Sequence, residues 1–138
     1  AREALILLAR LGRRGSDVSA SLRAARAAMH HPDLHQPALS LLAAIGRPEA
    51  QQALHDEAGR NDLPEPSRRL AVAALEASVV RHGLLLTTRE MLADYRVYNR
   101  ATDADTRRAA ADVLDVIEAP SRAPRSVSVD APPARPTR

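Results

Sequence analysis

Apolar residues recur at helical spacing in four stretches of the chain. In each stretch they lie at positions i, i+3, i+4 and i+7, which places them on one stripe of an α-helix. The third stripe ends in a serine. The four stripes are Ala4-Leu7-Leu8-Leu11, Ala38-Leu41-Leu42-Ile45, Ala71-Ala74-Leu75-Ser78 and Ala110-Val113-Leu114-Ile117. The pattern predicts an all-α chain whose helices each bury one side.

The stripes begin at residues 4, 38, 71 and 110, which gives spacings of 34, 33 and 39 residues. Self-similarity at such a period is typical of arrays of helical repeats. The third spacing is longer because the helix that ends before Gly83 has about one additional turn. The pattern therefore predicts about three and a half repeats and seven helices.

Helix-breaking and capping residues divide the chain between the stripes. Gly12 and Gly46 each follow a stripe, where a left-handed residue commonly ends a helix. Pro48 suits the first turn of the next helix because no hydrogen bond is lost there. Ser16 predicts an N-cap for the second helix, and Thr87 with Glu90 a capping box. The expected helices cover residues 2–11, 16–30, 36–45, 48–58, 67–82 and 87–99, and a last helix that starts at Asp103 or Asp105 and ends at Ala119.

The C-terminal residues 120–138 have no hydrophobic period and contain five of the ten prolines. We expect them to form a disordered tail after a folded segment at 1–119. The tail holds four Arg and one Asp, so 16 of the 20 basic residues and 16 of the 17 acids lie in residues 1–119. The folded part is thus neutral, and the net charge of +3 comes from the tail.

Composition excludes several classes of site. The chain has no Cys, Phe or Trp and two Tyr, so thiolate chemistry is excluded and the core must be aliphatic. No stretch approaches the roughly 18 apolar residues of a membrane span. Since no signal peptide is visible either, we expect a cytoplasmic protein. The chain begins with Ala1 inside a helical pattern, so we also expect it to be part of a longer protein.

Two segments, residues 41–54 (LLAAIGRPEAQQAL) and 66–78 (PSRRLAVAALEAS), resemble bacterial HEAT-like repeats of the kind found in phycobilisome lyases. The resemblance covers residues 1–119. It implies an α-solenoid of antiparallel helix pairs with an extended inner surface for partners, but no particular activity. The basic start of the family's helices is matched by Arg68-Arg69 and Arg107-Arg108 and not by the first two stripes.

The cluster His30, His31, Asp33 and His35 has the residue types that bind zinc or nickel. Its neighbouring histidines would point apart on a helix, so a solvated loop is the simpler interpretation. No nucleophile, phosphate-loop or dinucleotide motif occurs. We therefore expect neither an enzyme nor a cofactor.

Six residues are candidates for binding a partner. Arg68-Arg69 and Arg107-Arg108 could hold an acidic protein, although ion pairs such as Glu65 with Arg69 would give them a structural role. Tyr95 and Tyr98 could anchor a protein, since Tyr is common in binding hot spots, or could pack on the last helix.

The favoured function is a non-catalytic scaffold that binds another protein. The alternative is salt-sensitive binding of nucleic acid or an acidic partner through the arginine pairs and the tail. Neutrality of residues 1–119 and the scarcity of stacking aromatics argue against nucleic acid.

Overall fold

The computed structural model describes residues 1–122, which are helical apart from short connections. No strand occurs in this part of the chain, so the all-α prediction is confirmed. In chain order the elements are α1 (Arg2–Arg13), the short 3-10 helix η1 (Ser19–Ser21), α2 (Leu22–Ala28), α3 (His35–Ala44), α4 (Pro48–Ala58), α5 (Glu65–His82), α6 (Thr88–Arg100) and α7 (Ala104–Arg122).

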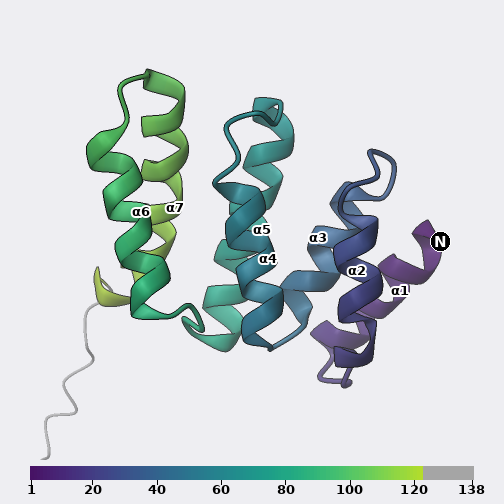
Figure 1. The fold of residues 1–138 in the computed structure, drawn as a ribbon. Coiled ribbons are helices and arrows are strands. Elements are labelled where there is room, and N and C mark those ends of the chain that lie inside the picture. The colour runs from purple at the N-terminus through teal and green to yellow at the C-terminus, as the bar shows by residue number, and fades with distance from the viewer. Residues whose placement is uncertain (123–138) are drawn as a thin grey trace, which may run out of the picture.

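The helices follow one another across the molecule, with α1 to α3 at one end and α6 with α7 at the other (Figure 1). Helices α1, α3, α5 and α7 form a row in which each contacts the next; we call this the odd row. Helix α2 packs on α3, α4 lies against both α3 and α5, and α6 packs on α7. The seven predicted helices are thus present.

Three of the four predicted stripes form the core. All members of the stripe at 38–45 and of the stripe at 110–117 are buried. In the stripe at 71–78, Ala74 is half-buried and the other three are buried. Burying these side chains supplies the main driving force for packing the odd row against its neighbours.

The first predicted stripe is wrong by one position. Helix α1 buries Leu5, Ala9 and Gly12, whereas Leu7 and Leu11 of the predicted stripe are 57% and 37% exposed. Residues 4–9 are all apolar, so the pattern alone does not determine which side is buried. The packing of α1 on α3 selects the side at positions i, i+4 and i+7. The spacing of 34 residues from Ala4 to Ala38 therefore does not join equivalent buried positions.

Gly12 and Gly46 are also not left-handed, because positive φ angles in the described chain occur at Gly15 and Gly83. Both glycines are needed for space instead. A Cβ on Gly12, which lies inside α1, would be 2.8 Å from a Val18 methyl carbon. A Cβ on Gly46 would be 2.8 Å from Nδ1 of His82, so this corner meets the end of α5 closely.

The helix starts agree with the prediction at two sites and differ at a third. Pro48 opens α4, and Thr87 with Glu90 forms the capping box of α6. In contrast, Ser16 does not cap the second helix. Asp17 accepts the backbone N–H of Ser19 at 2.9 Å, and a 3-10 turn precedes α2. The Asp side chain therefore arranges this start in place of the serine.

A buried glutamine holds the turn between α5 and α6. Gln51 of α4 is fully buried and donates to the Ser78 hydroxyl at 3.2 Å and to the Gly83 carbonyl at 3.0 Å. Its side-chain carbonyl accepts the backbone N–H of Leu85 at 2.7 Å. The amide thus satisfies backbone groups of the turn that would otherwise be buried without partners.

Helix α7 continues three residues beyond the predicted boundary at Ala119, with Pro120 inside it, and ends at Arg122. The rest of the predicted tail, residues 123–138, lies outside the described residues.

Candidate functional site

The arginines of the first predicted pair lie in the valley between α5 and α7, and both have acidic partners. Arg68 is 6% exposed and donates to Asp112 of α7 at 2.6 Å. Arg69 points to solvent and donates to Glu65 one turn earlier on α5. Neighbouring residues on a helix point about 100° apart, which explains why one joins two helices and the other pairs locally.

The second pair is divided in the same way. Arg107 donates to the Ala101 carbonyl at 2.8 Å and thereby caps the C-terminal end of α6. Arg108 is exposed and lies beside Asp112 and Glu76 in the wall of the α5–α7 valley.

The two tyrosines are on α6 and are each 38% exposed. Tyr95 donates its hydroxyl proton to Glu118 of α7. Tyr95 therefore packs α6 on α7, while part of both rings stays open to solvent.

The α5–α7 valley has a volume of about 430 Å³ and carries charges of both signs. Three arginines and three carboxylates line it, with Val72 and Ala73 between them. The charged residues are Glu65, Arg68, Arg69, Glu76, Arg108 and Asp112. Because the charges are balanced within the valley, it attracts a charged partner of either sign only weakly.

The neighbouring valley, between α3 and α5, is different. It has a volume of about 360 Å³ and a floor made largely of alanine, with the exposed Leu70 in its wall. A further hollow of about 270 Å³ lies between α1 and α3 and shares Arg13, Gln36 and Ser40 with it. We call the two together the cationic groove. Its remaining lining residues are Arg2, Ile6, Ala9, Pro37, Leu39, Ala43, Ala44, Leu70, Ala73, Ala74, Ala77 and Arg81.

The charge of the cationic groove is unbalanced. Arg2, Arg13 and Arg81 line it, and within the described part of the chain no carboxylate does. No ion pair involving Arg2 or Arg13 occurs among residues 1–122. These side chains therefore present positive charge beside an apolar floor.

Arg81 also fixes the shape of the groove. Its guanidinium donates to the backbone carbonyls of Gly12 at 3.0 Å and Arg13 at 2.7 Å. It joins the C-terminal end of α5 to that of α1 across α3, where the Gly12 carbonyl also accepts the backbone N–H of Gly15. These hydrogen bonds therefore fix the position of α5 relative to α1 at one end of the groove.

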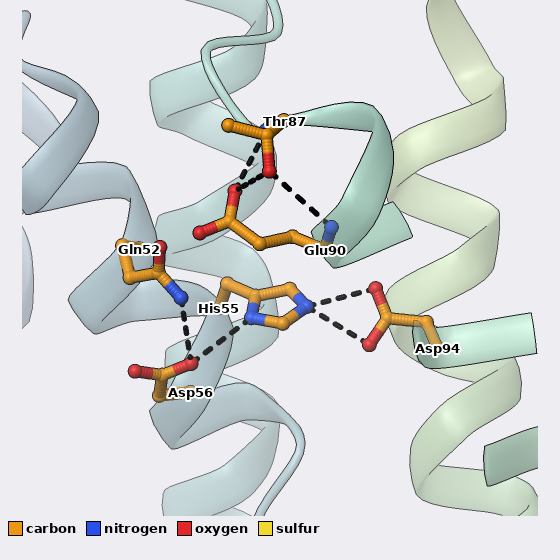
Figure 2. A network of polar contacts seen from close by, with 6 residues as sticks. All are labelled: Gln52, His55, Asp56, Thr87, Glu90 and Asp94. Atoms are coloured by element: carbon orange, nitrogen blue, oxygen red, sulfur yellow. Dashed lines mark hydrogen bonds and ion pairs between the residues drawn. The ribbon is translucent and has the colours of Figure 1, made fainter. Parts of the chain in front are cut away.

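A second polar cluster joins α4 to α6 (Figure 2). Nε2 of His55 lies 2.9 and 2.8 Å from the two carboxylate oxygens of Asp94, and Nδ1 lies 3.1 Å from Asp56. Figure 2 shows the ring placed between the two carboxylates. With both nitrogens engaged, neither is available as a general base, so the cluster is suited to holding helices together.

Burial of His55 opposes its positive charge, but the contacts to Asp94, and then those to Asp56, outweigh this and raise the pKa of His55 above its ordinary value. The imidazolium form is therefore the one that the two carboxylates stabilise.

The predicted metal cluster is not assembled. His30, His31 and Asp33 are exposed, while Nε2 of His35 lies 3.1 Å from the buried carboxylate of Glu57. Arg60 donates to the other oxygen of Glu57 at 3.1 Å. Within residues 1–122, no three His, Cys, Asp or Glu side chains are placed to share a metal ion.

No helix of the described part of the chain has the length and apolar content that crossing a membrane needs. No protein-family model, curated protein or solved structure matches the chain.

Sequence reasoning identified the α5–α7 arginines and missed the cationic groove. Arg13, which is followed by Arg14, and Arg81 lie 68 residues apart in the sequence, and each is typical of the basic last turn of a helix. The row of small residues on α5 at Ala73 and Ala77 was the available signal, since it marks a helix face open to close approach.

Proposed function

We propose that the chain is a non-catalytic protein-interaction scaffold, an α-solenoid of HEAT-like helix pairs that binds another protein along its odd row. The observation that carries this proposal is the cationic groove, an open apolar surface with unbalanced positive charge. Contiguous exposed apolar surface with a polar rim is typical of protein-binding sites.

The solenoid part of the proposal is supported by the succession of contacts α1 with α3, α3 with α5 and α5 with α7. In solenoids each repeat contacts its neighbours, and the stacked helices create extended surfaces that partners use. A protein partner also fits the groove better than nucleic acid does, because its floor is aliphatic and offers no aromatic ring for base stacking.

Affinity capture from a lysate of the source cells tests the proposal, using the wild-type chain and two charge-matched variants. Ala77→Glu places a carboxylate in the groove one turn before Arg81, and Ala93→Glu makes the same change at an exposed position of α6. We expect a protein to be retained by the wild type and Ala93→Glu and lost from Ala77→Glu.

Capture of no protein, or equal capture by all three chains, would contradict a scaffold that binds through this groove. Retention of nucleic acid alone, at low salt, would favour the alternative function.

A further inference from the structure

We infer that the cationic groove binds an acidic, amphipathic helical segment of a partner protein. This inference rests on the proposed function and specifies the chemistry and conformation of what is bound. Three observations support it: the charge of the groove, the spacing of its two hollows, and the like charge of this chain's own C-terminal residues.

The charge of the groove selects the sign of the partner. Three arginines line it without a described carboxylate, whereas the adjacent α5–α7 valley is lined by three arginines and three carboxylates. Bringing a basic segment into the groove would place like charges together, which disfavours that partner. Asp and Glu side chains flanking an apolar stripe would instead meet Arg2, Arg13 and Arg81.

The spacing of the two hollows selects the conformation. They lie on either side of α3, so their centres are separated by about one interhelix distance, roughly 8–10 Å. Two apolar side chains at i and i+7 of a helix are about 10.5 Å apart. On an extended strand the same-face separations are about 6.7 Å and about 13 Å, which bracket the required distance without matching it. Of these spacings the helical one lies nearest to the interhelix distance, so the geometry favours a helix with one apolar side chain over each hollow.

The C-terminal residues of this chain are poor candidates for the groove. Residues 123–138 contain three Arg and one Asp, so they carry the same sign of charge as the groove. An acidic segment of another protein is the occupant that the charges favour.

The test begins with selection of a displayed library of random 16-residue peptides on the intact 138-residue chain. We expect the enriched sequences to combine large apolar residues seven positions apart with an excess of Asp and Glu. Their affinity is then measured by fluorescence anisotropy for the wild type and for Arg13→Gln. Arg10→Gln is the matched control, because Arg10 is also exposed and lies on the same helix.

We expect Arg13→Gln to weaken binding by about twofold to fivefold, the upper part of the range for one exposed ion pair. Arg10→Gln, which removes the same charge outside the groove, should change it by less than about 1.5-fold. Ala77→Glu should weaken binding by more than about tenfold and Ala93→Glu should not, because only Ala77 lies in the groove. Circular dichroism confirms that each variant is folded.

Two outcomes would overturn this inference and leave the scaffold proposal standing. One is enrichment of basic or uncharged peptides. The other is binding that Arg69→Gln weakens and Arg13→Gln does not, which would move the site to the α5–α7 valley. Enrichment of no peptide, with no protein captured from lysate, would contradict both proposals.

Two other occupants are also distinguishable. Tighter binding of a labelled 20-nucleotide DNA in competition with the peptides would assign the groove to nucleic acid. A dimer of the wild type that Ala77→Glu converts to a monomer in sedimentation analysis would assign it to a second copy. Either result would overturn the inference.

Discussion

The two valleys beside α5 both lie between neighbouring helices of the odd row but differ in charge balance. On the α7 side, Arg68 is neutralised by Asp112, and Glu65 and Glu76 lie among the remaining arginines. On the α3 side, Arg13 and Arg81 lie over alanines with no described carboxylate in the lining. The comparison shows that arginine content does not identify a binding surface. Under the proposed function the distribution of carboxylates does, because a cation already paired within the chain contributes little to a partner.

The largest expected effect comes from the core that supports both valleys. Leu42 of α3 is fully buried, so Leu42→Ala should lower the free energy of unfolding by about 2–5 kcal/mol through the cavity it leaves. Leu7→Ala is the matched control, because Leu7 is 57% exposed and its loss should cost within about 0.5 kcal/mol. Urea denaturation measures both. Equal losses would show that the buried side of α1 is the one first predicted from the sequence.

A smaller effect is expected from removing the charge balance of the α5–α7 valley. Asp112→Asn leaves the buried Arg68 guanidinium without its carboxylate and should cost about 1–3 kcal/mol in urea denaturation. The same change should increase binding of acidic peptides at the α5–α7 valley, which makes the two valleys more alike. An unchanged urea midpoint would show that the ion pair does not hold α5 to α7.

The His55 cluster gives a pH-dependent effect on the α6–α7 side of the molecule. Because contacts to Asp94 and Asp56 raise the pKa of His55, the stabilisation is complete below the unfolded value of about 6.5 and is lost as the pH rises through the folded pKa. His55→Gln should therefore cost on the order of 1 kcal/mol at pH 6 and less at pH 9.

The groups that face His55 are Asp94 from α6 and Asp56 from α4, with Gln52 also bonded to Asp56. Urea midpoints of the wild type and His55→Gln across pH 6–9 measure the effect. Asp94→Asn should remove most of the pH dependence that His55 gives to the stability. A difference between the two urea midpoints that increases toward pH 9 would contradict stabilisation by a charged His55.

The smallest expected effect on stability is at the groove itself. Arg13→Gln should change the free energy of unfolding by within about 0.5 kcal/mol, since the exposed Arg13 side chain has no carboxylate partner among the described residues. Thermal melts of the wild type, Arg13→Gln and Arg69→Gln measure the stability change at each arginine. A loss of more than 1 kcal/mol on Arg13→Gln would show that Arg13 supports the fold, and would weaken its assignment to a partner.

The helices and most of the core were predictable because they depend on local patterns. The spacing of Leu41, Leu42 and Ile45, and the pair Thr87 and Glu90, are visible within eight residues of sequence. The buried side predicted for the first stripe was wrong because six consecutive apolar residues in α1 leave that side undetermined. The left-handed conformation predicted for Gly12 and Gly46 was wrong because these glycines are needed for close contact with distant residues, which no local pattern encodes.

The candidate site was not predictable for the same reason. Adjacent arginines at 68 and 69 attracted attention in the sequence, although the fold brings Asp112 to Arg68 from 44 residues away. Arg13 is likewise adjacent to Arg14, but nothing local links it to Arg81, and the two meet only because α1 and α5 both flank α3. The Gln51 network likewise depends on a turn more than 30 residues later.

The most direct test of the central claim is to map where an acidic peptide obtained by selection contacts the 138-residue chain. Amide chemical-shift changes on titration with the peptide provide this map. We predict that the largest changes lie along the cationic groove, at Gln36, Ser40, Ala43 and Ala77. Changes centred on Arg108 in the α5–α7 valley, or on Tyr95 and Tyr98 of α6, would contradict the claim that the unbalanced groove is the binding surface.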